Sequence, residues 1–294
     1  AIRAAAAQAG GASWERSCIA VWSPKGGVGK TTIGIEIAAA LSAIGGRKVA
    51  LVDANMNGGH VRIRLDVMSE NNILSVATAY SMSHGHESLQ RDLNNKINDS
   101  MVKVKGCPNL SVLTGITNME QSRNPSLASK QGIAFIRYLL SYLRRTYDFV
   151  IVDMGSSINV GVHSGTFDEA DKVLVVTTPD MTSIADAKQG VHNSIIPEYG
   201  LQLDRFGLVI NDWQDNLGIT LDKAAEYTQI PAIGVIPMNI EGLVTKAGNE
   251  GRSFVAHYAS NKDNPPSVER TLNGFVSLAA HFYPPVGTAW GARD

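Results

Sequence analysis

A glycine-rich segment near the start of the chain sets the strongest limit on how the chain can fold. Residues 25–32 read Lys-Gly-Gly-Val-Gly-Lys-Thr-Thr, and they stand between an apolar run at 18–22 and an amphipathic stretch at 31–43. Apolar residues at successive positions are typical of a strand buried on both faces, whereas the amphipathic stretch has the period of a helix. The segment therefore predicts a tight loop that joins a buried strand to a helix.

The same alternation of short apolar runs and longer amphipathic stretches continues along the chain. Expected strands span 18–22, 49–52, 110–113, 149–152, 173–177, 206–210 and 233–236. Expected helices span 31–43, 126–145, 183–196, 220–227 and 267–281. This order predicts an α/β fold with a mostly parallel, twisted sheet and helices on both of its faces.

One domain accounts for most of the 294 residues, a length that allows one large core. The alanine-rich start predicts a linker or disordered segment at 1–15, followed by the domain at 16–285 and a tail at 286–294. The polar stretch at 81–105 is the least patterned part, and we expect it to be an excursion from the core.

The composition argues against several classes of function. Lys and Arg number 26 against 27 Asp and Glu, and this balance gives no general attraction to nucleic acid, which is therefore not an expected partner. Cys18 and Cys107 are far apart and neither belongs to a C-x-x-C pair, so no zinc or cluster site is indicated. No apolar run reaches the roughly 20 residues that a membrane-spanning helix needs. We expect a cytoplasmic protein with reduced thiols.

The residue types of the glycine-rich segment suit the binding of a nucleoside triphosphate. The glycines let the backbone close around an anion with its N–H groups pointing inward, and the helix that follows adds its positive N-terminal end. The lysine before the threonines supplies a positive charge to the β- and γ-phosphates, and the first threonine hydroxyl is placed to bind Mg²⁺. Expected nucleotide-binding residues of this loop are Gly26, Gly27, Val28, Gly29, Lys30, Thr31 and Thr32.

Two features of the loop go beyond the general pattern of phosphate-binding loops (P-loops). Pro24 stands where that pattern has its first glycine, so one amide donor is missing. Lys25 precedes the glycines, and with it the segment 25–32 resembles the deviant Walker A signature of the MinD/ParA group of P-loop ATPases. The resemblance runs from about 18 to 284 and implies a P-loop NTPase fold of the SIMIBI type, ATP or ADP with Mg²⁺ as ligands, and a homodimer across ATP. In such a dimer Lys25 would reach the nucleotide of the other subunit.

Two buried strands end in an acidic residue that we expect beside the loop. Asp53 follows the run at 49–52 and Asp153 follows the run at 149–152, and parallel strands present their carboxyl ends at one edge of the sheet. Thr31, Asp53 and Asp153 are therefore the expected ligands of Mg²⁺. We expect the backbone N–H of Gly155 to sense the γ-phosphate, so that 156–161 would be one switch loop and 55–60 the other.

Asn55 departs from the family pattern, which usually has a second aspartate at this position to orient the attacking water. Asparagine can hold a water molecule but cannot accept its proton. Slow ATP hydrolysis to ADP and phosphate is therefore predicted, with Lys25, Lys30, Asp53 and Asn55 as the expected catalytic residues.

Two later strand ends resemble the parts of the family that recognise adenine. Asn211 ends the run at 208–211, and Pro237 ends the turn at 234–237. An asparagine at a strand end is commonly a turn residue, so both assignments depend on the resemblance.

Members of the group use ATP-driven dimerisation to position cellular machines, and this chain most resembles the CpaE/TadZ pilus-assembly branch. Its expected partners are proteins of a pilus or secretion machine that would recruit it to a pole or to the inner face of the membrane. The segment at 1–15 would fit a linker after an upstream receiver-like domain. Pro284, Pro285 and Gly287 argue against the amphipathic membrane helix that ends MinD.

Two alternatives stay open. A nonhydrolysing scaffold that binds nucleotide for structure and localises a partner is favoured by Asn55. A chromosome- or plasmid-partitioning ATPase would bind arbitrary duplex DNA in a salt-sensitive way.

Replacing Asn55 by aspartate tests the assignment of slow hydrolysis. We expect Asn55→Asp to release phosphate from ATP faster than the wild type, because a carboxylate can take the proton of the attacking water. Turnover of both proteins under saturating Mg-ATP measures the effect, and an unchanged rate would count against the role given to Asn55.

Overall fold

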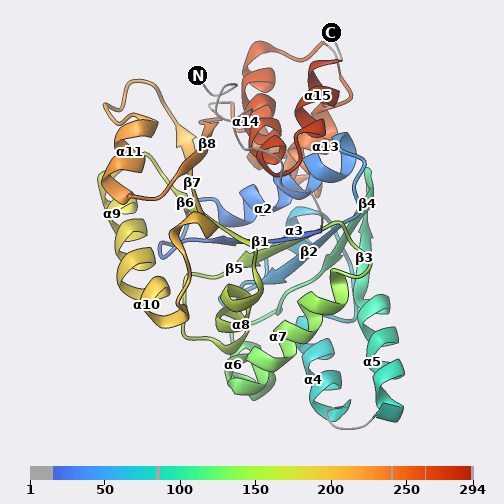
Figure 1. Cartoon of the computed structure of the whole chain (residues 1–294). Coiled ribbons are helices and arrows are strands. Elements are labelled where there is room, and N and C mark those ends of the chain that lie inside the picture. Colours follow the sequence, from blue (N-terminus) through green and yellow to red (C-terminus); the bar gives the residue numbers. More distant parts are fainter. Residues whose placement is uncertain (1–15, 84–86, 240, 262, 293–294) are drawn as a thin grey trace.

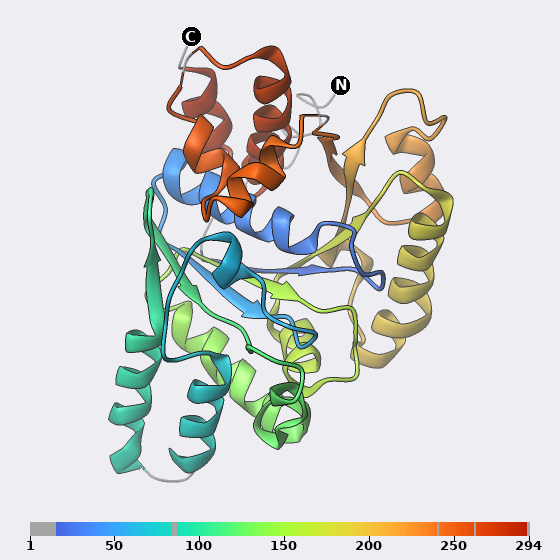
Figure 2. The same cartoon turned by 180° about the vertical axis from the view of Figure 1, so that it is seen from behind.

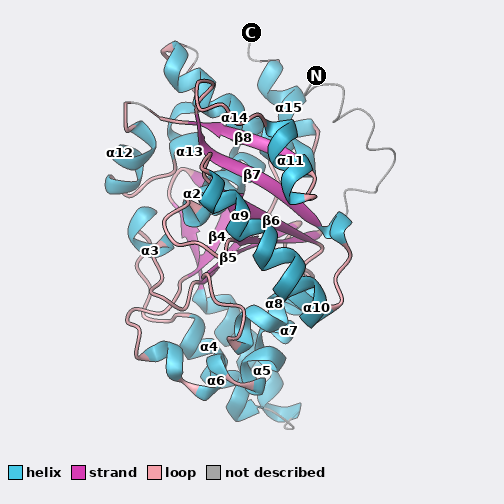
Figure 3. Cartoon of the chain, turned by 90° about the vertical axis from the view of Figure 1, so that its left-hand side faces the viewer, coloured by secondary structure: helices cyan, strands magenta, loops and turns pink. Residues whose placement is uncertain are grey.

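The computed structural model describes residues 16–83, 87–239, 241–261 and 263–292. In these residues a single eight-stranded sheet runs through the centre, with helices on both of its faces (Figures 1 and 2). The strand order is β3-β4-β2-β5-β1-β6-β7-β8. Every neighbouring pair is parallel except β3 and β4. The predicted α/β fold is confirmed, and Figure 3 shows its strands between two layers of helices.

The strands are β1 (Ser17–Trp22), β2 (Val49–Ala54), β3 (Met101–Val104), β4 (Cys107–Leu113), β5 (Phe149–Met154), β6 (Lys172–Thr177), β7 (Phe206–Trp213) and β8 (Ala232–Pro237). The α-helices are α2 (Lys30–Ala39), α3 (Val61–Arg64), α4 (Ile73–Ser83), α5 (Glu87–Ser100), α6 (Pro125–Ala128), α7 (Lys130–Leu143), α8 (Gly161–Glu169), α9 (Met181–Gly190), α10 (Ile196–Tyr199), α11 (Leu221–Thr228), α12 (Leu243–Asn249), α13 (Phe254–Tyr258), α14 (Pro266–Phe282) and α15 (Pro285–Gly291). Short π-helical turns, η1 (Ala40–Ile44) and η3 (Val191–Ile195), extend α2 and α9.

Alternate side chains of the central strand β1 enter two separate cores. Ile19 and Val21 pack with residues of α2 and of the C-terminal helices α12 to α15. Cys18, Ala20 and Trp22 pack on the other face with residues of α4, α5, α7, α8, α9 and α11. Because both faces are covered, β1 is apolar and buried from Cys18 to Trp22, as the sequence predicts.

All seven predicted strands are present with bounds close to those expected, and the differences concern segments with weak patterns. The stretch at 81–105, where the sequence predicts neither a helix nor a strand, contains α5 and the edge strand β3. Only Leu93 and Ile97 of α5 are buried in the core. Its asparagines hide the helical period, yet two of them accept hydrogen bonds from tyrosine hydroxyls of α7, Asn94 from Tyr138 and Asn98 from Tyr142.

The end of the chain also differs from expectation, because residues 285–291 form the helix α15 where the sequence predicts the start of a tail. Pro285 occupies the first turn, where proline is tolerated because the missing N–H has no acceptor within the helix. Val286 is fully buried. In the described residues no helix is long and apolar enough to cross a membrane. The linker predicted at 1–15 lies outside the described residues.

A buried carboxylate joins α2 to the C-terminal helices. Glu36, in the middle of α2, accepts hydrogen bonds from the hydroxyl of Ser253 (2.6 Å) and from the backbone N–H groups of Phe254 (3.0 Å) and Val255 (2.8 Å). These N–H groups belong to the first turn of α13, where no acceptor exists within the helix. The helix that follows the glycine-rich loop is thereby tied to α13.

We expect Glu36→Ala to lower the free energy of unfolding by about 3–5 kcal/mol, because it leaves three buried donors without an acceptor. Glu36→Gln keeps one acceptor oxygen and should lose about 1–3 kcal/mol. Glu226→Ala, an exposed change on α11, is the control and should stay within about 0.5 kcal/mol of the wild type. Chemical denaturation measures all three, and equal stabilities of Glu36→Ala and Glu226→Ala would contradict the role of Glu36.

Candidate nucleotide-binding site

The glycine-rich loop joins β1 to α2 at the carboxyl edge of the sheet, as predicted. Gly27 and Gly29 have φ angles of 78° and 97°, a region that other residues rarely adopt. A Cβ atom on Gly29 would lie 2.3 Å from the side-chain nitrogen of Asn211. Glycine at position 29 is therefore required both by the backbone and by the packing of β7 against the loop.

A cavity of about 390 Å³ opens in front of the loop. This volume lies in the range of sites for small molecules, and the N-terminal end of α2 gives it a positive potential. One side is formed by Gly27, Gly29, Lys30, Thr31 and Thr32, and the other by Asn55, His60, Ile63 and Arg64. The loop thus faces the first predicted switch segment across a space that suits phosphates.

Lys30 links the loop to the second predicted switch segment. Its Nζ donates to the carbonyl oxygen of Lys25 (2.9 Å) and to the hydroxyl of Ser156 (3.4 Å). Burial lowers the pKa of Lys30, and the charge of Asp153 opposes this effect. The ammonium group is thus held at the cavity by groups that a phosphate oxygen can replace as acceptor.

Thr31 and Asp153 form a site that fits a divalent cation. The hydroxyl of Thr31 donates to Oδ2 of Asp153 (2.6 Å), whereas Oδ1 of Asp153 is buried and has no hydrogen-bond partner. Asp53 lies opposite Asp153 in the register of β2 and β5. Burial raises the pKa of both carboxyl groups, and the neighbouring Asp53 raises that of Asp153 further.

A cation would relieve the repulsion between these two carboxylates. In the described part of the chain no group of three or more His, Cys, Asp or Glu side chains could hold a metal alone. Mg²⁺ bound by one or two protein oxygens takes its remaining ligands from water and phosphates. When bound, it would supply positive charge to the phosphate oxygens.

Asp53 is also the anchor of the loop that follows β2. Its two oxygens accept hydrogen bonds from the backbone N–H groups of Asn55 and Val61, both at 3.1 Å. A Cβ atom on Gly115 would lie 2.6 Å from the Asp53 carboxyl carbon, so the next loop also packs directly on it. Both of its oxygens have partners, and its role as a metal ligand stays a prediction.

Asn55 and Gly155 bring the two predicted switch loops together. Asn55 lines the cavity, and its side-chain oxygen accepts a hydrogen bond from the N–H of Asn57 (3.1 Å). A Cβ atom on Gly155 would lie 3.1 Å from that oxygen. The N–H of Gly155 points toward Nε2 of His163 at 3.4 Å.

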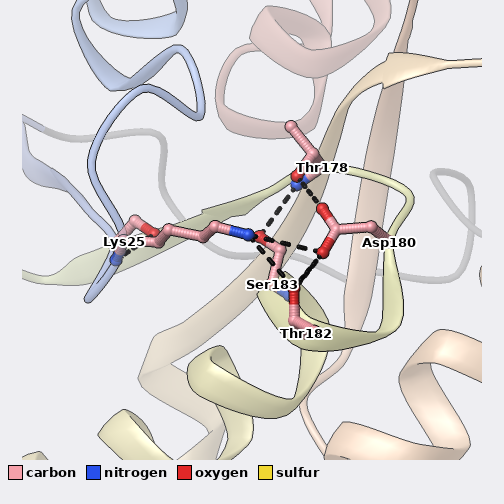
Figure 4. A network of polar contacts seen from close by, with 6 residues as sticks. Lys25, Thr178, Asp180, Thr182 and Ser183 are labelled. Carbon is pink, nitrogen blue, oxygen red and sulfur yellow. Dashed lines mark hydrogen bonds and ion pairs between the residues drawn. The ribbon is translucent and has the colours of Figure 1, made fainter.

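Lys25 is not among the residues that line the cavity, and it points toward the start of α9 (Figure 4). Its Nζ lies 3.4 Å from Oδ1 of Asp180 and 3.2 Å from the hydroxyl of Thr182. Burial raises the pKa of the Asp180 carboxyl, but this effect is outweighed. Hydrogen bonds from Thr178, Thr182 and the N–H of Ser183 hold that pKa well below its usual range. Both partners of the ion pair are more than a third exposed, so it contributes at most about 1 kcal/mol and breaks readily.

Asn211 supports the loop from the neighbouring strand. Its side-chain nitrogen donates to the carbonyl oxygen of Val28 (3.1 Å) and to Asp212 (3.3 Å). Pro237 ends β8 and pairs with Trp213 at the end of β7. Of the two, Asn211 contacts the loop, and the contacts of both residues with adenine stay predictions.

Sequence reasoning misses two basic residues of this region. Arg64 donates to the hydroxyl of Thr32 (2.9 Å) from α3, and Arg62-Ile63-Arg64 shortly after β2 is the signal that would have indicated it. His163 is fully buried between the two switch loops. A single histidine has no pattern that distinguishes it from a surface residue, so only the fold shows its position.

Comparison with known proteins agrees with this geometry. The model of a family described as AAA domain matches residues 16–195. The septum site-determining protein MinD of Thermotoga maritima is 29% identical over 240 residues, which cover 79% of each chain.

Solved structures show the same fold. A ParA family ATPase from Chlorobium tepidum has a TM-score of 0.70 at 20% identity, covering 90% of this chain and 99% of that one. The septum site-determining protein MinD from Pyrococcus horikoshii, complexed with Mg-ADP, has a TM-score of 0.69 at 19% identity, covering 93% and 98%. The predicted P-loop NTPase fold is confirmed.

Removing the Thr31 hydroxyl tests the cation site. Thr31→Val keeps the shape of the side chain, and we expect the gain in ATP affinity caused by Mg²⁺ to fall about tenfold, equivalent to about 1.4 kcal/mol. Thr31→Ser keeps the hydroxyl and is the matched control. Calorimetric titration with ATP in Mg²⁺ and in EDTA measures the difference. The same Mg²⁺ dependence in Thr31→Val and the wild type would exclude Thr31 as a ligand.

Proposed function

Because the chain belongs to the MinD/ParA family of P-loop ATPases, we propose that it is a molecular switch that binds ATP with Mg²⁺, dimerises while ATP is bound and separates after slow hydrolysis. The P-loop, the cavity in front of it and the Thr31–Asp153 pair support the binding of Mg-ATP.

The direction of the Lys25 side chain is the main observation that supports the proposed dimer. A loop lysine that served its own nucleotide would point into the cavity, as Lys30 does, but Lys25 is held on α9 by a weak, exposed ion pair. A small free-energy gain is enough to release it toward a second subunit.

Exposed apolar side chains on the same edge of the sheet support a dimer interface. Large hydrophobic residues of a monomer are normally exposed singly, whereas a gathering of them marks an interaction surface. The segments that follow β2, β4, β6 and β8 at their carboxyl ends each carry such residues: Ile63 and Met68, Met119, Met181, and Met238. The most exposed of them, Met68, is 79% accessible.

The groups around the cavity support slow hydrolysis. In the described part of the chain no carboxylate lines it, and the side-chain oxygen of Asn55 lies close to Gly155. Without a nearby carboxylate, the attacking water is oriented by hydrogen bonds but its proton is not accepted. The bound ATP would therefore persist, and so would the dimer.

The relatives reported above are named for septum-site determination and for the ParA family, so we propose that the switch positions a protein partner in the cell. Placement in the pilus-assembly branch stays a prediction from the sequence resemblance, because none of those relatives has a pilus name. Asn55 also favours a second candidate, a scaffold that binds ATP and does not hydrolyse it.

Light scattering with Mg-ATP, with Mg-ADP and without nucleotide, alongside phosphate release, separates these functions. We expect a dimer with Mg-ATP only, which decays as phosphate is released. Lys25→Ala should stay monomeric while it still binds ATP, and Lys103→Ala, an exposed change on the edge strand β3, should behave as the wild type.

A dimer in all three states without phosphate release would replace the switch by the scaffold. Binding of arbitrary duplex DNA by the ATP-bound protein at low salt would instead favour a partitioning ATPase.

A further inference from the structure

One buried histidine contacts the residue before the first predicted switch loop and a residue of the second. The Nε2 atom of His163, in the first turn of α8, lies 2.7 Å from the carbonyl oxygen of Ala54, and its Nδ1 atom lies 2.5 Å from the carbonyl oxygen of Ser157. Ala54 directly precedes Asn55, and Ser157 belongs to the loop after Gly155. The imidazole ring therefore spans the distance between the two loops.

The ring has three hydrogen-bonding neighbours, more than the two nitrogens of a neutral imidazole can satisfy. The two carbonyl oxygens each need a donor, and the N–H of Gly155, 3.4 Å from Nε2, needs an acceptor. Burial lowers the pKa of His163 and the charge of Lys30 lowers it too, against the effect of the two carbonyls, so the neutral ring carries one N–H.

Two hydrogen-bond arrangements follow from the two tautomers. In one, Nδ1–H donates to Ser157 and Nε2 accepts from the N–H of Gly155. In the other, Nε2–H donates to Ala54, and the N–H of Gly155 has no acceptor on the ring. The first arrangement gives Ala54 no donor on the ring, and the second gives Ser157 none.

The ring is packed closely against the backbone around it. A Cβ atom on Gly155 would lie 3.0 Å from its Cε1 atom. A Cβ atom on Gly161, at the start of α8, would lie 2.0 Å from the carbonyl oxygen of Ser129, so α8 is fixed against the start of α7. The hydrogen bonds of this closely packed ring therefore connect the residues that lie on its two sides.

We propose that His163 is a positioning residue that couples the γ-phosphate contact of Gly155 to the placement of Asn55. When a terminal phosphate takes the N–H of Gly155, Nε2 loses its donor and the tautomer with Nε2–H is favoured. Nδ1 releases a proton to water and Nε2 takes one from water, so the ring stays neutral. Nε2–H then holds Ala54, and through it the backbone of Asn55. This inference rests on the proposed switch function.

Two amide replacements distinguish the roles of the two ring nitrogens. Glutamine places its amide near the position of Nε2 and can keep the bond to Ala54, whereas asparagine places its amide near Nδ1 and can keep only the bond to Ser157. A role in packing alone would be disturbed by both variants, whereas coupling is lost only in His163→Asn.

Hydrogen exchange of the backbone with a nonhydrolysable ATP analogue provides the readout. In the wild type and in His163→Gln, we expect the analogue to slow exchange in both 54–60 and 155–160. In His163→Asn it should slow exchange only in 155–160. We also expect kcat for ATP hydrolysis to fall about tenfold in His163→Asn, with KM within about threefold of the wild type.

The outcomes distinguish the coupling from the switch. Protection of both segments in His163→Asn would overturn the coupling and leave the switch intact, whereas protection of neither segment in the wild type would overturn the switch. The wild type alone provides a second test if a variant fails to fold. The ¹⁵N chemical shifts of His163 should show that the analogue moves the proton from Nδ1 to Nε2, and an unchanged tautomer would overturn the proposal.

Discussion

The site depends on the burial of two aspartates at the ends of neighbouring strands. Asp53 and Asp153 lie side by side in the register of β2 and β5, and neither is accessible to solvent. Two buried carboxylates are unstable unless donors or cations surround them. The backbone of the loop after β2 closes on Asp53, and Thr31 and Lys30 lie against Asp153. The groups that stabilise these two carboxylates come from the loop after β2 and from the start of α2. These segments therefore lie close together at the ends of β2 and β5.

The helix α2 connects this buried polar site to the C-terminal helices. Its first residue, Lys30, is buried at the cavity, and its middle residue, Glu36, is buried at α13. Both polar side chains have their partners outside the helix, so the loop cannot shift without disturbing the C-terminal helices. One side of the candidate nucleotide site is therefore tied to the C-terminal helices, whereas the loops after β2 and β5, the predicted switch loops, form its other sides.

The fold was largely predictable from the sequence because buried parallel strands and the glycine-rich loop leave local signals. The seven strands found in this way are runs made mostly of apolar residues. In contrast, β3 is a short edge strand, and α5 has only two buried apolar residues among polar ones. The first turn of α15 consists of residues that usually end helices, so its pattern was misleading.

The site was predictable only in part, for a related reason. The residues that lie at the site as predicted are in the sequence motif itself or at the end of a strand next to it. They are the glycines, Lys30, Thr31 and the strand-ending aspartates. Asp180 meets Lys25 across 155 residues of sequence, and Ala54 meets His163 across 109. Such pairs arise from the order of strands in the sheet, and no periodicity or spacing announces them.

The contact between Gly29 and Asn211 has a consequence for how this site can evolve. Any side chain at position 29 would collide with the amide of Asn211, and that amide holds the carbonyl of Val28. The residues at positions 29 and 211 therefore depend on each other, although β7 and the loop lie far apart in the sequence. A residue with a Cβ atom at position 29 would displace this amide and remove its hydrogen bond to Val28, so the end of β7 limits which residues the glycine-rich loop can accept.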